Sequence, residues 1–468
     1  MTVSSGPVAA VGLVLALLAQ ATPPLAPHQQ LAHDIYKQLI EINTTDSVGS
    51  TTDAANAMAA RFRAAGFPDA DIFVGGASPK HGNLVVRVHG RTPGLKPILL
   101  LAHLDVVEAN KADWSPDLDP FKFIEKDGFY YGRGTSDDKA MAAIFVANLI
   151  RMKQQRLVPE RDLVLALTAG EEGGADNGVV WLLANHRSLV DAEFGFNEGG
   201  GGQAKNGKKI ANRVQASEKV YEDFTLEVTN KGGHSSQPQP TNAIYQLAAA
   251  LEAISKFSFP VKLNEVTRGY FEKMAGVERG QVAADFRALL QPTPDAAALA
   301  RLSAIPLYNS MLRTTCVATM VNGGHAANAL PQRATANVNC RILPGEDAAE
   351  VQQTLTRVIG DPAVSVTSVK PPKPSPPSPL TPQLMETLTR ITEEMWPGVP
   401  VVPVMSTGAT DGLYFRQAGI PIYGLSGLFG DMDDVRAHGK DERMGVKEFY
   451  DGQEFLWWAV NTLSGAKK

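Results

Sequence analysis

The sequence predicts an α/β protein with a doubly wound, mostly parallel sheet into which a ferredoxin-like domain is inserted. Residues 97–107 form an apolar run that turns polar at His103 and Asp105, which is typical of a strand buried on both faces. Similar runs alternate with helical patterns along most of the chain. Between residues 217 and 370 the order changes to β-α-β-β-α-β, the order of a ferredoxin-like unit.

Length and charge limit the function classes. The chain has 468 residues, enough for two or three domains, and a formal net charge of -5. Because no basic excess is present, we expect no nucleic-acid partner but a small molecule or peptide. Cys316 and Cys340 are compatible with one disulfide or with two buried thiols.

The N-terminus resembles an export signal. The apolar run from Val8 to Ala19 is shorter than the roughly 20 residues that span a bilayer. Residues 19–21, Ala-Gln-Ala, have the form of a cleavage site. We expect a signal peptide at residues 1–21, a secreted or periplasmic protein, and no stable membrane span after cleavage. Because no lysine or arginine precedes the run, an uncleaved anchor is the alternative.

The first part of the main domain is expected at residues 28–216. Helical spacing of apolar residues predicts helices at residues 28–42, 51–65 and 140–152. Apolar runs predict strands at residues 83–88, 162–168 and 192–196, besides the one that ends at His103. Polar residues follow three of these strands directly, at the strand ends where α/β sheets bind ligands.

The inserted domain is expected at residues 217–370. Strands are predicted at residues 223–229, 314–321, 333–343 and 363–369, and helices at 241–256 and 347–359. Residues 260–313 are mostly helical and have no place in this order. Seven prolines in residues 371–382 predict a stiff connector, with a ligand for a recognition domain as the less favoured alternative. Residues 383–468 return to α/β alternation and complete the main domain.

Acidic and histidine side chains collect at the predicted strand ends and in a later loop. They are His103, Asp105, Asp137, Asp138, Glu171, Glu172, Glu198 and His438. So many carboxylates would repel one another, and one or two divalent cations would relieve the repulsion. Imidazole and carboxylate ligands suit zinc, with cobalt or manganese as alternatives, and the absence of thiolates argues against a purely structural site.

Two adjacent glutamates would have separate uses in such a site. If Glu172 binds metal, Glu171 can accept the proton of a metal-bound water and pass it to a leaving group. One aspartate shared by two metals would hold them as a pair, and Asp105 would hold the ring of His103 by its other nitrogen. Singly, each residue has an ordinary structural interpretation, for example a helix cap for Asp138 or a surface position for His438.

Together these residues carry a resemblance to a known family. The motifs are His103-x-Asp105-Val-Val, Gly132-Arg-Gly-Thr-Ser-Asp137-Asp-Lys, Glu171-Glu172, Glu198-Gly-Gly, Gly233-His234-Ser-Ser and His438-Gly. In this order the chain resembles the co-catalytic zinc metallopeptidases of the M20 family. Further motifs resemble its carboxypeptidase S and N-acyl amino acid hydrolase branch: Arg313-Thr-Thr, Gly323-Gly324, Asn328-Ala-Leu-Pro and Asn339-Cys-Arg341-Ile-Leu-Pro-Gly.

The resemblance implies a catalytic domain with two zinc ions and an inserted lid and dimerisation domain. One ion would be held by His103, Asp137 and Glu198, and the other by Asp137, Glu172 and His438, so that Asp137 bridges the pair. Glu171 would be the general base. The Asp137–Asp138 peptide bond would be cis.

The resemblance also implies substrate-binding residues outside the metal site. His234 would help to stabilise the tetrahedral intermediate, often across a dimer, and Arg341 would hold the substrate carboxylate. The loop Gly408-Ala-Thr-Asp411 resembles the substrate-facing loop of the family.

We therefore expect an exported di-zinc hydrolase that cleaves the amide bond next to a free carboxylate, as a carboxypeptidase or dipeptidase. An N-acyl amino acid hydrolase would use the same chemistry, and the sequence does not separate the two. A non-catalytic peptide or amino-acid binding protein is a remote alternative, because such a protein would be expected to have lost a ligand or the base.

Overall fold

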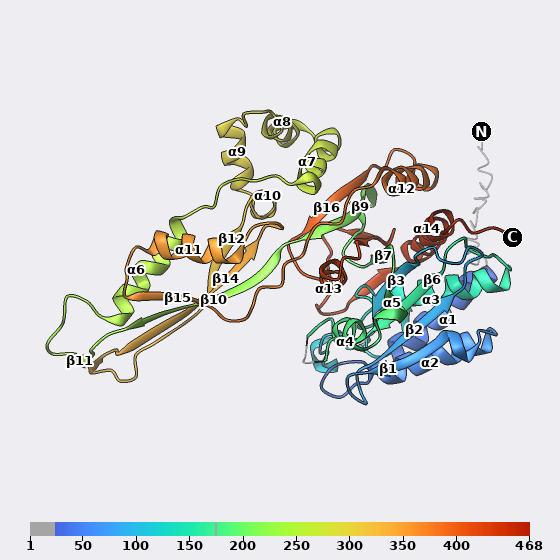
Figure 1. Cartoon of the computed structure of the whole chain (residues 1–468), viewed down its shortest axis with the longest axis horizontal. Coiled ribbons are helices and arrows are strands. Elements are labelled where there is room, and N and C mark those ends of the chain that lie inside the picture. Colours follow the sequence, from blue (N-terminus) through green and yellow to red (C-terminus); the bar gives the residue numbers. More distant parts are fainter. Residues whose placement is uncertain (1–23, 174–175) are drawn as a thin grey trace, which may run out of the picture.

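The structure is a computed structural model that describes residues 24–173 and 176–468. The predicted signal peptide, residues 1–21, lies outside these ranges. Figure 1 shows an elongated molecule with a large sheet at one end and a smaller sheet at the other. Within the described ranges, no helix has both the length and the apolar character needed to cross a membrane.

Ten of the described strands form the main sheet, in the order β1-β2-β6-β3-β7-β17-β9-β8-β18, with β16 beside β9. They are β1 (Ile72–Gly76), β2 (Gly82–Val88), β3 (Ile98–His103), β6 (Leu163–Thr168), β7 (Phe194–Asn197), β8 (Gly201–Lys205), β9 (Lys208–Glu218), β16 (Val401–Ser406), β17 (Ile422–Gly424) and β18 (Phe429–Asp431). The central pairings β6-β3, β3-β7 and β7-β17 are parallel, and antiparallel pairings lie on both sides. The predicted α/β class is confirmed.

Helices cover both faces of the main sheet, and both faces of its central strand β3 are accordingly apolar. Ile98, Leu100 and Ala102 point into one core, with α1 (Pro27–Glu41), α2 (Thr51–Ala64), α3 (Lys139–Gln154), α12 (Pro382–Met395) and α14 (Val446–Ser464). Leu99 and Leu101 point into the opposite core, with α4 (Gly178–Asn185), α5 (Arg187–Val190) and α13 (Gly412–Gln417). A small sheet of β4 (Ile124–Lys126), β5 (Phe129–Tyr131) and β19 (Arg443–Gly445) lies apart from the main sheet.

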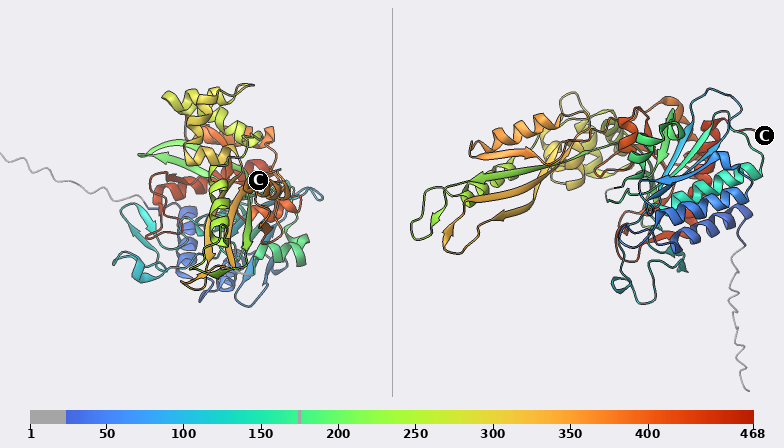
Figure 2. Two further views of the ribbon diagram at one scale, coloured as in Figure 1. Left: turned by 90° about the vertical axis from the view of Figure 1, so that its left-hand side faces the viewer. Right: turned by 60° about the horizontal axis from the view of Figure 1, so that its bottom comes forward.

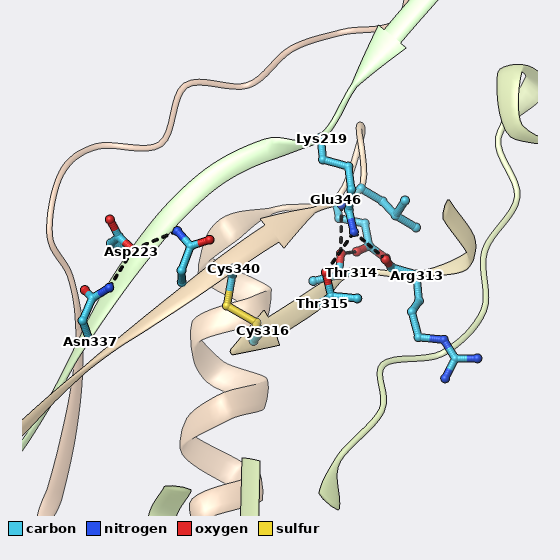
Figure 3. The surroundings of a disulfide bond; sticks show 11 residues. Lys219, Asp223, Arg313, Thr314, Thr315, Cys316, Asn337, Cys340 and Glu346 are labelled. Atoms are coloured by element: carbon cyan, nitrogen blue, oxygen red, sulfur yellow. Dashed lines mark hydrogen bonds between the residues drawn. A yellow bond between two sulfur atoms is a disulfide. The ribbon is translucent and has the colours of Figure 1, made fainter. Parts of the chain in front are cut away.

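The second sheet is antiparallel and has the order β12-β14-β10-β15. In chain order its elements are β10 (Val220–Thr229), α6 (Ala243–Lys256), β12 (Thr315–Gly323), β14 (Arg333–Ile342), α11 (Ala348–Ile359) and β15 (Val364–Ser368). This is the predicted β-α-β-β-α-β order, and the two helices share one core with the sheet. Cys316 and Cys340 face each other on β12 and β14 and form a disulfide (Figure 3), so the thiol alternative is wrong.

The helical stretch inside this unit packs on the main sheet. It contains α7 (Glu265–Val277), α8 (Gly280–Leu289), α9 (Ala296–Ser303) and α10 (Pro306–Leu312). Its core includes Ala211 of β9 and Val402 and Val404 of β16. These helices lie between α6 and β12 in the sequence, but in space they pack on strands β9 and β16 of the main sheet.

Several chain segments run between the two sheets and meet at Lys219. The Nζ of this buried lysine donates hydrogen bonds to the carbonyl oxygen of Arg313 and to the hydroxyl of Thr315 (Figure 3). It also donates to the carbonyl oxygen of Ser310. Burial lowers the pKa of Lys219 to about 7. A cavity of about 360 Å³ beside it is lined by both the β9–β10 crossing and the returning residues 369–371.

The proline-rich connector runs from the second sheet back to α12 without helix or strand. It packs along the main sheet, because Ser378 donates its backbone N–H to Ala216 and its hydroxyl to Ile422, both at 2.7 Å. Ser375 donates to Glu218, which forms a buried ion pair with Arg416 at 2.7 Å. The connector is thus anchored by hydrogen bonds to strands β9 and β17 of the main sheet.

Candidate metal centre

The five predicted metal ligands come from separate segments that end at one edge of the main sheet. His103 is the last residue of β3, Glu198 directly follows β7, and Glu172 lies in the loop after β6. These three strands are parallel neighbours, so their carboxyl ends meet at the same edge. Asp137 lies in the loop before α3, and His438 lies in the loop between β18 and β19.

The five side chains form two groups that share Asp137. In His103, Asp137 and Glu198, and again in Asp137, Glu172 and His438, ligand atoms lie within 4.8 Å of one another. Oδ1 of Asp137 is 3.0 Å from Nε2 of His103, and its Oδ2 is 3.1 Å from Nε2 of His438. The two oxygens of one carboxylate thus face two different imidazoles, as a bridging ligand would require.

Asp105 lies beside two of these ligands. The nearest partner of Nδ1 of His103 is the carbonyl oxygen of Asp105 at 3.0 Å, whereas the Asp105 carboxylate is 3.8 Å away. Oδ2 of that carboxylate accepts the backbone N–H of Glu172 at 2.9 Å. The residue therefore orients the His103 ring with its backbone and the Glu172 loop with its side chain.

Most of the buried carboxyl groups of the cluster are costly to ionise. Burial raises the pKa of Glu171 to about 8 and that of Glu172 to about 7, and it also raises the pKa values of Glu198 and Asp138. Burial acts in the same direction on Asp137, but hydrogen bonds from His103 and His438 outweigh it and lower the pKa.

The donor set fits a pair of divalent cations. The two groups offer imidazole nitrogens and carboxylate oxygens with no thiolate, which suits zinc and related ions at a reactive site. The hydrogen bond with Asp137 raises the pKa of His438 to about 9, as expected for an imidazole placed among carboxylates.

Sequence reasoning singled out Gly408 in the loop after β16, but the buried charge of that loop is Asp411. Its carboxylate accepts hydrogen bonds from Asn177 at 2.6 Å and from Thr168 at 3.2 Å. Burial raises the pKa of Asp411 to about 6, and its charge contributes to the raised pKa of Glu171. Gly408 itself is exposed. The signal for Asp411 was present, since an acidic residue follows an apolar strand here as it does after β3 and β7.

Arg341 reaches this same loop from the second sheet. It lies on β14, with its guanidinium 4.6 Å from the centre of the Tyr221 ring. Its Nη1 donates to the carbonyl oxygen of Thr407 at 3.4 Å. The side chain therefore bridges the second sheet and the loop that carries Gly408.

His234 does not join the cluster within this chain. It lies on the short strand β11 (Gly233–His234), which pairs with β13 (Ala329–Leu330). Figures 1 and 2 show β11 at the end of the molecule that is remote from the main sheet. Its ring is exposed and lies 2.8 Å from the hydroxyl of Ser236.

The peptide bond between Asp137 and Asp138 is cis, as the family resemblance implied. Asp138 is buried directly before α3, so this bond lies between a candidate ligand and the start of a buried helix.

Comparisons relate this chain to known proteins. The model of the family described as "Peptidase family M20/M25/M40" matches residues 99–460. The human "N-fatty-acyl-amino acid synthase/hydrolase PM20D1" is 29% identical over 384 residues, which cover 79% of this chain and 74% of that protein. Carboxypeptidase S of Saccharomyces cerevisiae is 28% identical over 276 residues, 56% of this chain and 48% of that protein.

Solved structures share the fold. An M20 family metallo-carboxypeptidase from Sulfolobus solfataricus, Sso-CP2, has a TM-score of 0.67 at 17% identity, over 92% of this chain and 99% of that one. The YXEP protein of Bacillus subtilis, described as a dinuclear metal binding peptidase, has a TM-score of 0.60 at 11% identity, over 94% and 99% of the two chains.

Proposed function

The chain belongs to the M20/M25/M40 family of peptidases and is a hydrolase acting on peptide or amide bonds, and we propose that it is an exported di-zinc enzyme that cleaves the amide next to a free carboxylate. The observation that carries this proposal is the pair of three-residue groups that share Asp137. In the leading form of the proposal the substrate is a peptide, and the enzyme is a carboxypeptidase or dipeptidase.

The ligands would divide as the distances suggest. His103, Asp137 and Glu198 would hold one cation, and Asp137, Glu172 and His438 the other. Zinc suits these donors best, with cobalt or manganese as alternatives. When bound, the cations would supply Lewis acidity that polarises the amide carbonyl and acidifies water.

Glu171 would move the proton. It lies next to Glu172 in sequence but belongs to neither ligand group, so its carboxylate is left for acid–base work. It would take a proton from the attacking water and deliver it to the leaving nitrogen. Burial, followed by the charges of Asp411 and Glu172, raises its pKa, which makes it a stronger base than an exposed glutamate.

Arg341 would recognise the substrate carboxylate. A guanidinium offers two parallel donors that match a carboxylate, and the Tyr221 ring beneath it holds its plane. Because Arg341 comes from the second sheet, substrate binding would connect the two sheets. We propose residues 28–216 and 383–468 as the catalytic domain, 217–370 as the inserted lid, whose helices α7–α10 pack on the main sheet, and 371–382 as the connector.

A second candidate is an N-acyl amino acid hydrolase. It is favoured by the relative named as an N-fatty-acyl-amino acid synthase/hydrolase, whose match covers more of this chain than that of carboxypeptidase S. The chemistry is the same in both cases, since the acyl group replaces an amino-acid residue on the far side of the amide.

Activity assays on matched substrates test the proposal. A dipeptide and an N-acyl amino acid with the same C-terminal residue should differ in kcat/KM, and at least one should be hydrolysed. A strong chelator should abolish that activity and added zinc should restore it, because the carboxylate cluster requires its cations. Failure of the zinc-loaded protein to turn over either class would favour the non-catalytic binding protein.

The protein would act as a homodimer through the second sheet. Among the described strands, β12 pairs only with β14 and exposes Val317, Met320 and Val321, so its outer edge is free to pair with a second copy. His234, remote from the metal centre of its own chain, would then complete the site of the partner.

Complementation distinguishes the two possible placements of His234. His234→Ala and Glu171→Gln should each be nearly inactive alone, yet their co-expression should restore up to about a quarter of the wild-type activity, since half of randomly formed dimers are mixed and each has one complete site. The reason is that a mixed dimer keeps one site with an intact Glu171 and a His234 from the other chain. Activity that stays at the low level of the separate variants, although mixed dimers are recovered, would mean that His234 acts within its own chain. Full activity of His234→Ala alone would mean that His234 has no role.

Export is supported by the disulfide between Cys316 and Cys340, which persists in oxidising compartments. It agrees with residues 1–21 as a signal peptide that is removed from the secreted or periplasmic protein. N-terminal sequencing of the mature protein checks this, since an uncleaved anchor would leave Met1 in place.

A further inference from the structure

A buried ion pair connects the loop of Asp137 with the loop of His438. Nη1 of Arg133 and Oε2 of Glu442 are 2.7 Å apart, and their side chains are only 3% and 1% exposed. The two residues are 309 positions apart in the sequence. We call this pair the Arg133–Glu442 clasp.

Glu442 binds the segment that leads to Asp137. Its Oε2 also accepts the backbone N–H of Gly134, and its Oε1 accepts the backbone N–H and the hydroxyl of Ser136 at 2.7 and 2.9 Å. The same Oε1 accepts the backbone N–H of Asp137 at 3.1 Å. One carboxylate thus fixes the backbone up to and including the shared candidate ligand, through charge-assisted hydrogen bonds.

Arg133 binds the segment that carries His438. Its Nη2 donates to the carbonyl oxygens of Gly439 at 3.1 Å and of His438 at 3.5 Å. His438 has a φ of 61°, a left-handed conformation that is costly for a residue other than glycine and persists only where the surroundings impose it.

Packing does not hold the His438 ring, because its side chain is 53% exposed. Two things place the ring: its contacts with the carboxylates of Asp137 and Glu172, and the backbone of His438, which the guanidinium of Arg133 holds. A buried ion pair is weak evidence for stability, since well-packed apolar residues often stabilise a protein equally well. The contribution of this pair is to hold the backbone segments of Asp137 and His438 at a fixed separation.

We propose that Arg133 and Glu442 are positioning residues that set the separation of Asp137 and His438 and so the affinity of the second cation position. This inference rests on the proposed function, because it takes the two residue groups to be metal sites. His438 belongs to the second group alone, so loss of the clasp should weaken that position more than the first.

The test is cation binding by the purified apo-protein, measured by competition with a chromophoric chelator and by the absorption spectrum of bound Co²⁺. Glu442→Gln keeps the shape of the side chain and removes its charge. We expect the second cation to bind about 10- to 100-fold more weakly, as when other partners of metal ligands are removed, with a smaller change for the first. The Co²⁺ spectrum of the second position should also change.

Glu218→Gln is the matched control, because Glu218 and Arg416 form an equally buried ion pair, with side chains 1% and 2% exposed. This pair contacts the loop after β16, through the backbone N–H of Thr410, and not the loops of Asp137 and His438. The substitution should lower the melting temperature by a similar amount and leave both cation affinities unchanged. If Glu442→Gln fails to fold, Arg133→Lys is the second variant. It retains the positive charge but lacks the second donor nitrogen that binds the His438 segment, so it should weaken the second cation position as well.

The outcomes separate the two proposals. Wild-type protein that binds no pair of cations would overturn the proposed function itself. Wild-type protein that binds two cations, with Glu442→Gln or Arg133→Lys binding both equally well, would overturn only the positioning role. An equal loss in Glu218→Gln would show that general destabilisation, not the clasp, controls the affinity.

Discussion

Replacing Glu171 with glutamine should reduce kcat by roughly 10²- to 10⁴-fold and leave two cations per chain, because a positioned general base contributes about that much and no ligand is lost. Glu171 is outside both ligand groups, whereas the neighbouring Glu172 lies within 4.8 Å of ligand atoms of Asp137 and His438. The measurements are steady-state kinetics at saturating substrate and metal analysis of the same preparation.

Glu172→Gln is the paired control, because it makes the same chemical change one residue away. It should lower metal content, and excess zinc should recover part of its activity. Glu171→Gln should show no such recovery. If metal analysis gave the opposite pattern, the roles assigned to the two glutamates would have to be exchanged.

Replacing Arg341 with methionine should cost roughly 2 to 5 kcal/mol of transition-state binding, the range for truncating one partner of a buried charge pair. A substrate amidated at its C-terminus should suffer a similar loss with the wild-type enzyme. The two changes remove one interaction, so their combined effect should be far below the sum. The measurement is kcat/KM for both enzymes on both substrates.

Arg333→Met provides the control for this experiment. Arg333 lies on the same strand, β14, and pairs with Glu227 at 3.3 Å, so the substitution changes the second sheet without touching the loop after β16. It should leave kcat/KM nearly unchanged on both substrates. Equal cleavage of amidated and free substrates by the wild-type enzyme would mean that the substrate-binding site does not recognise a carboxylate.

The parts of the fold that were predictable carry simple apolar patterns. β3 is buried along its whole length and directs alternate residues into two cores, so its sequence is apolar throughout and marks the centre of a helix-covered sheet. Since neighbouring strands are parallel, the residues after β3, β6 and β7 had to meet at one edge. That argument collected the candidate ligands without any knowledge of distances.

The parts that were missed have mixed patterns because their surroundings are mixed. β9 contains Arg213, Gln215 and Glu218 among apolar residues, and it pairs with β8, β16 and β17 while α7 packs beside it. No alternation of period two survives in such a strand. The Arg133–Glu442 clasp was equally invisible, since nothing local in the sequence links two residues 309 positions apart.

The gathering of chain crossings at Lys219 has a mechanical consequence. Besides the β9–β10 crossing and the returning residues 369–371, the helical stretch α7–α10 adds two more links, and both pass this point. Lys219 donates a hydrogen bond to the carbonyl oxygen of Arg313. The backbone N–H of Lys262 donates to the carbonyl oxygen of Leu312 at 2.9 Å, which joins the two ends of the helical stretch. Because the four links lie close together, a rotation of the second sheet about Lys219 would move His234, which lies at the remote end of that sheet, farther than the residues near the crossing.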